Sequence, residues 1–281
     1  MSAYENYSRT AAAYDRTRSA VGHEIWLGHL AAMGRAMTGL RVLDAGCGTA
    51  NYTLALAPRV ARVTALDLNP AMLGAAARKL DRVGLAAKVD LVRGSMTDLP
   101  LADQSHDAVL FNHVLHHLGR ADGGGFAGCG RAIAEAARVL RPGGRVFINA
   151  CSRTQMAHGF WYCGLAPAAL EKIQALMVPS GELRAILATA GLDVDTTISI
   201  LSPTMMAEAY DDGRGPLDPS WRDGDSFWAL VGDQELRRVE ARITEMDRAG
   251  TLDDYVAEHD RARRHVGQAT FWVARKPVVG S

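Results

Sequence analysis

Residues 42–53 read Val-Leu-Asp-Ala-Gly-Cys-Gly-Thr-Ala-Asn-Tyr-Thr, and this stretch decides the fold of the chain. The apolar residues that open it predict a buried strand, and the segment from Asn51 onward is compatible with a helix. Gly46 and Gly48 form the turn between them. Because glycine has no Cβ, a ligand can approach the backbone of such a turn closely, and the helix that follows offers unpaired N–H groups. The stretch therefore predicts a nucleotide-binding turn.

Two kinds of nucleotide-binding turn compete for this pattern. The dinucleotide fingerprint Gly-x-Gly-x-x-Gly needs a third glycine, and Asn51 stands in its place. An acid two residues before the first glycine, here Asp44, is also foreign to that fingerprint. The string Leu43–Thr49 instead resembles the first motif of class I S-adenosylmethionine-dependent methyltransferases. This resemblance implies that the cofactor is bound by Asp44, Gly46, Cys47 and Gly48.

A second acid lies at the end of the next expected strand. Residues 63–67 are mostly apolar and end at Asp67, about 20 residues beyond the glycine turn, which is the spacing that suits a ribose-binding acid. The resemblance implies that Asp67 binds the ribose and that Leu68 lies against the adenine. Asn69 and Pro70 then predict a helix start, as N-cap and first helical residue.

The third block of the resemblance is residues 91–100. Members of the family often carry an acid directly after the glycine of this block, at the position where this chain has Ser95. The resemblance therefore implies that Ser95 and the backbone of Met96 contact the adenine, with Asp98 as the alternative.

Two later blocks complete the resemblance. Residues 106–118 are similar to the fourth strand of the family and the segment after it, which implies that Asn112 lies beside the methionine part of the cofactor. Residues 137–148 are similar to the helix, Pro-Gly-Gly turn and fifth strand. Five matches in this order are far more specific than any single motif. The chain thus resembles the small-molecule, UbiE-like (methyltransferase-11/25-like) branch, which implies a methyltransferase (EC 2.1.1) with S-adenosyl-L-methionine as its cofactor.

Strands and helices alternate along the first half of the chain, which predicts a parallel sheet with helices on both faces. Together with the resemblance, this predicts an α/β, doubly wound, mostly parallel seven-stranded Rossmann-like sheet whose last strand is antiparallel. Ligands of such sheets bind at the carboxyl ends of the strands. The expected strands are 41–45, 62–67, 88–93, 106–111, 144–150, 193–201 and 268–274. The expected helices of this part are 51–57, 70–83, 130–140 and 180–190, the last capped by Ser180.

The segments outside this alternation predict three regions. Residues 1–40 are expected to form an N-terminal helical lid, residues 41–201 and 268–277 the cofactor-binding core, and residues 202–267 a helical lobe inserted between strands six and seven. In the insertion, 211–224 is typical of a loop, and a helix is expected at about 233–248 from an apolar stripe, with another from 252. A lobe that covers the mouth of the site is favoured over a dimer arm.

Methyl transfer from a sulfonium is an in-line displacement that needs positioning more than a nucleophilic side chain, and positioning can supply about 7–11 kcal/mol. A general base is nevertheless conceivable, because His113 and His116 follow the fourth expected strand and histidine titrates near neutral pH. The alternative is that the Leu-His-His-Leu element packs, with its histidines bonded to backbone. His116 and His117 cannot share one helix face, so at most one of the two is expected to point at the substrate.

Aromatic residues suggest two further contributions. Tyr7 and Tyr14 lie in a segment that resembles the leading helix of small-molecule methyltransferases and are expected to close over the sulfonium, where a cation gains about 0.5–2 kcal/mol from a ring face. Tyr14 is also a candidate catalytic residue; surface packing is the alternative for both. A second group clusters outside the motifs and predicts either a pocket wall or the core of the lobe: Phe160, Trp161, Tyr162, Trp221, Phe227 and Trp228.

The composition limits the class of partner. The 281 residues carry 31 basic and 31 acidic side chains, and this balance argues against a nucleic-acid partner. No apolar run approaches the ~18 residues of a membrane span, so no membrane association is expected. Four cysteines without a Cys-x-x-Cys pair fit a reduced, cytoplasmic protein, and no metal site is expected.

The sequence therefore predicts methyl transfer to a small molecule, of the kind found among secondary metabolites, by a monomer or a homodimer. It leaves open which element accepts the methyl group: oxygen, nitrogen, carbon or sulfur. Two alternatives remain: an S-adenosylmethionine-binding enzyme of other chemistry, such as decarboxylation or cyclisation, and a non-catalytic cofactor-binding partner.

Overall fold

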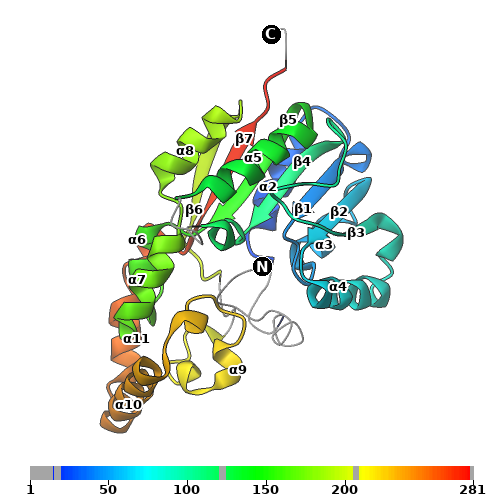
Figure 1. Ribbon diagram of the computed structural model, residues 1–281. Coiled ribbons are helices and arrows are strands. Elements are labelled where there is room, and N and C mark those ends of the chain that lie inside the picture. Colours follow the sequence, from blue (N-terminus) through cyan, green and yellow to red (C-terminus); the bar gives the residue numbers. More distant parts are fainter. Residues whose placement is uncertain (1–14, 16–19, 120–124, 205–208, 279–281) are drawn as a thin grey trace.

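A seven-stranded sheet with the order β3-β2-β1-β4-β5-β7-β6 organises the chain. The computed structural model describes residues 15, 20–119, 125–204 and 209–278 (Figure 1). The first five strands pair in parallel, and β7 runs antiparallel to both β5 and β6. The strands are β1 (Arg41–Ala45), β2 (Arg62–Asp67), β3 (Val89–Arg93), β4 (His106–Asn112), β5 (Leu140–Ala150), β6 (Asp193–Ile200) and β7 (Ala269–Arg275). The predicted fold class is confirmed.

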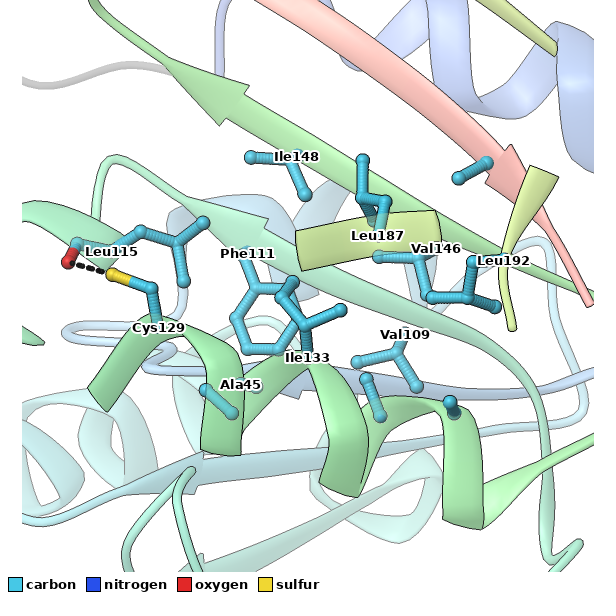
Figure 2. Close-up of a cluster of buried hydrophobic side chains, with 14 of the residues drawn as sticks. Ala45, Val109, Phe111, Leu115, Cys129, Ile133, Val146, Ile148, Leu187 and Leu192 are labelled. Carbon is cyan, nitrogen blue, oxygen red and sulfur yellow. Dashed lines mark hydrogen bonds between the residues drawn. The ribbon is translucent and has the colours of Figure 1, made fainter. Parts of the chain in front are cut away.

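Helices cover both faces of the sheet because neighbouring strand residues point in opposite directions. Val42 packs in a cluster with Trp26 of α2 and Leu56 of α3, whereas its neighbour Leu43 packs in a cluster with Ile133 of α5. Figure 2 shows the second cluster, in which side chains of α5 lie against β4 and β5. The helices beside the sheet are α2 (His23–Ala31), α3 (Asn51–Leu56), α4 (Pro70–Arg82), α5 (Ala127–Val139) and α8 (Ser180–Thr189).

A third cluster lies away from the sheet, where Figure 1 shows a group of helices beyond the carboxyl ends of the strands. It joins buried side chains from 151–177, directly after β5, with others from 210–256. The ring of Tyr162 contacts the rings of Trp221, Phe227 and Trp228 at centroid distances of 5.3, 5.7 and 5.6 Å. The cluster rests on α6 (Arg153–His158), α7 (Pro167–Leu176), α9 (Pro219–Arg222), α10 (Asp233–Ala249) and α11 (Leu252–Asp260); α12 (Arg263–Val266) leads into β7.

The outlying aromatic residues are thus packed in a core of their own. Each of the six is at most 6% exposed, because the rings contact one another. This agrees with the packing interpretation and not with a pocket wall, although the cluster also includes residues before the segment 202–267.

The expected elements differ from the structure at a few points. Strand β5 begins at Leu140, before the Pro-Gly-Gly turn, because Leu140 pairs with His106 ahead of an irregularity in the ladder. Helix α9 lies within 211–224, which was expected to be loop; Asp218 caps it through Ser220 N. Ser180 is the first residue of α8, and Pro179 stands at the N-cap position expected for Ser180, whereas Asn69 caps α4 as predicted. In the part of the chain that the structure describes, no helix has the length and apolarity needed to span a bilayer.

Candidate cofactor and active site

The glycine turn after β1 is bonded to the end of β2. Gly46 N and Cys47 N both donate to the carbonyl oxygen of Leu66, at 2.7 and 2.9 Å. One residue further, Gly48 N donates to Asp67 Oδ2 at 2.9 Å, and Asn69 N donates to Asp67 Oδ1 at 2.8 Å. The Asp67 carboxylate is therefore held at the carboxyl edge of the sheet, directly beside the turn.

Three left-handed residues shape this turn. Gly46 has φ +82°, and a Cβ there would lie 2.5 Å from Val114 Cγ2, so both its conformation and its surroundings require glycine. Gly48 has φ +53°, but a Cβ would meet nothing within 4 Å, so only the backbone conformation favours glycine. Ala50 has φ +69°, which is unfavourable for a residue with a Cβ.

Asp44 and Asn112 lie at the carboxyl ends of the neighbouring strands β1 and β4, and both have buried polar side-chain atoms. Asp44 is 1% exposed and accepts a hydrogen bond of 2.6 Å from Thr53 Oγ1. Burial raises the pKa of Asp44 to about 6, against the lowering effect of Thr53 and of nearby Asn112. Within the described residues, Asp44 Oδ1 and both side-chain polar atoms of Asn112 are buried without a hydrogen-bond partner. Such groups are rare in proteins and indicate a place where a polar ligand binds.

The other side of the turn offers an apolar surface. Leu68, next to Asp67, is 40% exposed, although large apolar side chains usually bury. Gly94 N donates to the carbonyl oxygen of Asp67 at 3.2 Å, which brings the loop after β3 alongside. In that loop, Ser95 Oγ lies 2.8 Å from the hydroxyl of Thr97, and Met96 Cε lies 3.1 Å from where a Cβ of Gly46 would stand.

Two histidines follow β4 at the same edge. His113 has φ +46°, and its N–H donates to Asn149 O of β5 at 2.8 Å. Its Nδ1 lies 4.0 Å from Cys151 Sγ. His116 Nε2 lies 3.2 Å from Ser226 Oγ, a residue of the region with the aromatic cluster.

The ring of His117 packs against the ring of His116. The two rings lie 4.0 Å apart between centroids. Burial, with a smaller effect of His116, lowers the pKa of His117 well below its usual value, so this ring is neutral at physiological pH. His116, in contrast, lies against Ser226.

The structure gathers the described candidate residues along one edge of the sheet. Asp44, Gly46, Cys47, Gly48, Asp67, Leu68, Ser95, Met96, Asn112, His113 and His116 all lie at or directly after the carboxyl ends of β1, β2, β3 and β4. Tyr7 and Tyr14 lie outside the described residues. Sequence reasoning missed Ser226 and Thr53, because no local pattern marks them and their contacts depend on the fold.

Comparison with known proteins identifies the domain. Residues 43–148 match the family described as "Methyltransferase domain". The chain is 33% identical over 145 residues to a demethylmenaquinone methyltransferase of Tropheryma whipplei, an alignment covering 50% of this chain and 56% of that protein. It is 31% identical over 175 residues to a ubiquinone biosynthesis O-methyltransferase of Methylocella silvestris, covering 60% and 64%. The chain thus spans less than two thirds of the length of these relatives.

Solved structures agree with the fold. A structure from Anabaena variabilis, described as a candidate methyltransferase from an antibiotic biosynthesis pathway, superposes with a TM-score of 0.71 at 19% identity and covers 89% of this chain and 96% of its own. Residues 43–148 therefore form a methyltransferase domain, and the fold of the solved structure agrees with it. The resemblance and the cofactor inferred from the sequence are confirmed.

The residues at the edge of the sheet fit this cofactor. The Asp67 carboxylate suits a ribose diol, the exposed Leu68 suits a purine face, and the unbonded oxygen of Asp44 with the amide of Asn112 suits a charged amino-acid end. Burial also raises the pKa of the Cys47 thiol well above its usual range, which keeps it protonated and unreactive within the turn.

Proposed function

We propose that the protein is an S-adenosylmethionine-dependent methyltransferase that moves a methyl group to a nucleophilic atom of a small molecule. The observation that carries the proposal is the pair of hydrogen bonds that fix Asp67 beside the glycine turn, in a chain whose residues 43–148 match the methyltransferase domain. The cofactor supplies an electrophilic methyl group bound to a sulfonium.

The residues of the chain are proposed to bind the cofactor and to orient it toward the acceptor. Asp67 is proposed to hold the ribose, Leu68, Ser95 and Met96 the adenine, and Asp44 with Asn112 the amino-acid end. The turn of Gly46, Cys47 and Gly48 offers backbone to the cofactor, and Tyr7 and Tyr14 are proposed as additional contacts. Alignment of the acceptor with the methyl group then supplies most of the catalysis.

His116 is the proposed proton acceptor. Its Nε2 lies 3.2 Å from Ser226 Oγ, and the neutral His117 ring lies against it, so the imidazole is held from two sides. Asp225, next to Ser226, accepts hydrogen bonds from Phe227 N at 2.8 Å and from the Tyr162 hydroxyl at 3.2 Å. The region with the aromatic cluster thus fixes the loop that reaches the histidine. His113 is the second candidate.

The substrate is proposed to be a small molecule, since both relatives are named for steps in quinone biosynthesis. We further propose that residues 202–267 form a lobe over the substrate side, that residues 1–40 contribute a lid over the cofactor, and that residues 151–177 pack with the lobe as their buried side chains indicate. A cytoplasmic monomer or homodimer without a nucleic-acid or membrane partner remains the prediction.

Two measurements test the proposal. Titration calorimetry with S-adenosylmethionine should show micromolar-range binding by the wild type and loss of binding by Asp67→Ala, whereas Asp81→Asn, an exposed acid on α4, should bind normally. Incubation with methyl-labelled cofactor and bacterial metabolite extracts should then transfer label to a small molecule. Turnover without label transfer would instead favour decarboxylation or cyclisation, and binding without any turnover would favour a non-catalytic partner.

A further inference from the structure

A charged cluster lies beside the cofactor turn and joins three separate parts of the sequence: Asp15, the segment Thr49–Asn51, and Lys79. Lys79 Nζ, from α4, lies 2.9 Å from Asp15 Oδ2, and the other oxygen of Asp15 accepts a hydrogen bond of 2.6 Å from Thr49 Oγ1. Lys79 Nζ also bonds to Asn51 Oδ1 and lies 3.4 Å from Thr49 Oγ1. Asp15 and Lys79 therefore hold the residues on both sides of Ala50.

Ala50 is the strained residue of the turn. Its φ of +69° lies in the left-handed region, where an alanine is disfavoured relative to glycine. Its side chain is also fully buried, directly before the first residue of α3. A residue in such a conformation persists only when its surroundings determine it. Thr49 and Asn51 are its direct neighbours, so bonds to their side chains restrain it from both sides.

The ion pair between Lys79 and Asp15 and its hydrogen bonds are strengthened because their side chains are partly shielded from solvent. The Lys79 side chain is 12% exposed and the Asp15 side chain 39% exposed, so the ion pair is partly shielded from solvent. Thr49 is 1% exposed. A hydrogen bond to a charged group in such a place is stronger than one between neutral groups.

We propose that Asp15 and Lys79 are positioning residues for the cofactor, which hold the Thr49-Ala50-Asn51 segment in the conformation that binds S-adenosylmethionine. This inference rests on the proposed cofactor site. Neither side chain needs to touch the cofactor. Without the ion pair, the competent turn is populated for only part of the time, and the apparent affinity falls by that fraction.

The first test is the cofactor affinity of single variants, measured by calorimetry. Asp15→Asn and Lys79→Met should each weaken S-adenosylmethionine binding by about threefold to tenfold. Lys79→Arg should retain most of the affinity, since it keeps the charge. Arg82→Met, which removes an exposed charge from the same helix, and Asp81→Asn are the matched controls and should bind like the wild type.

The direction in which Asp15→Asn and Lys79→Met change the cofactor affinity distinguishes positioning from a purely electrostatic effect. The cofactor carries a net positive charge, so a purely electrostatic influence would make Asp15→Asn weaken and Lys79→Met strengthen its binding. Positioning makes both weaken it. It also predicts the same loss for S-adenosylhomocysteine, which lacks the sulfonium charge. Effects of opposite sign would overturn the inference.

The second test relieves the strain. Ala50→Gly should change the affinity of the wild type little, but it should restore most of the affinity lost in Lys79→Met, because glycine adopts the left-handed conformation without help. Circular dichroism and thermal unfolding confirm that each variant is folded. Unchanged affinity in both single variants, or no rescue by glycine, would overturn the inference while leaving the proposed function intact. A wild type that binds no cofactor would overturn both.

Discussion

Gly48 N and Asp67 Oδ2 are joined by a hydrogen bond of 2.9 Å, which ties the glycine turn after β1 to the acid that ends β2. The two strands are parallel neighbours, so their carboxyl ends meet at one edge of the sheet. The bond means that Asp67 has two functions: it is the proposed ribose ligand, and it fixes the shape of the turn.

Asp67→Asn should therefore weaken cofactor binding through both functions. Both carboxylate oxygens accept from backbone N–H groups, and an amide presents a donor to one of them. An unpaired group of this kind costs about 1–3 kcal/mol, which corresponds to a loss of affinity of about fivefold to 150-fold. Calorimetry with S-adenosylmethionine measures the loss. An affinity equal to that of the wild type would show that Asp67 does not bind the ribose.

The pKa of Asp44 predicts how stability depends on pH. Burial raises the pKa of Asp44 from 3.8, the ordinary value that also applies to the unfolded chain, to about 6 in the folded protein. Between these two pH values the folded state therefore binds more protons than the unfolded state. Stability from this residue is therefore present below about pH 4 and lost as pH rises through 6, by about 3 kcal/mol in total.

Asp44→Asn removes that titration. Urea unfolding of the ligand-free protein at several pH values should show a loss of stability between pH 4 and 6 that is smaller in the variant, by up to about 3 kcal/mol. The Thr53 hydroxyl can still donate to the amide oxygen, so the variant is expected to fold. Parallel pH profiles for the two proteins would contradict the prediction.

Gly46 and Gly48 should respond differently to alanine. Gly48→Ala meets no neighbour and adds only the cost of a left-handed residue, about 1–2 kcal/mol. Gly46→Ala adds the same cost and also places a Cβ 2.5 Å from Val114 Cγ2, so it should destabilise the protein by a further 1–3 kcal/mol or so. Thermal unfolding compares them, and equal melting temperatures would show that the Val114 side chain moves away easily.

The fold was largely predictable because local patterns determine it. Strands β1 and β2 begin and end where expected, since apolar runs stop at Asp44-Ala45 and at Asp67. The long β5 was shortened in the prediction because Pro142-Gly143-Gly144 is typical of a turn, whereas Leu140 pairs with His106 ahead of it.

The site was predictable only where a motif carries it. Ser226 reaches His116 from 110 positions away, and Asp15 reaches Lys79 from another part of the sequence. Neither pair has a local pattern, because tertiary packing alone brings the partners together. The same holds for residues 151–177, whose buried side chains join those of 210–256.

Asp107 is predicted to stabilise the amino ends of the strands, at the other end of β4 from the candidate site. Its side chain is fully buried and accepts from Arg41 N at 2.8 Å and from the guanidinium groups of Arg35 and Arg141 at 2.5 and 2.9 Å. Burial opposes ionisation, but these donors outweigh it and lower the pKa of Asp107. Its stabilisation is therefore present above its unfolded pKa and lost as pH falls through the lower folded value.

Asp107→Asn should consequently destabilise the protein by about 3 kcal/mol at pH 7, because two arginines lose a buried charged partner. Asp103→Asn is the control, since that acid is exposed and pairs with the half-buried Arg138. Urea unfolding measures both variants. The cofactor affinity of folded Asp107→Asn should be unchanged, because the residue lies at the far end of β4 from Asn112.

The bond between His116 and Ser226 predicts a coupled loss of activity. If His116 accepts the proton, His116→Gln should lower label transfer about 10²–10⁴-fold. Ser226→Ala should lower the rate less, by about threefold to tenfold, because it removes one hydrogen bond that orients the ring.

The double variant should be no slower than His116→Gln alone, since Ser226 acts through the histidine. His265→Gln, which changes an exposed histidine of α12, is the control. Cofactor affinity should stay the same in all four proteins, which separates proton transfer from binding. Full label transfer by His116→Gln across the pH range would establish the packing alternative and leave positioning as the whole of the catalysis.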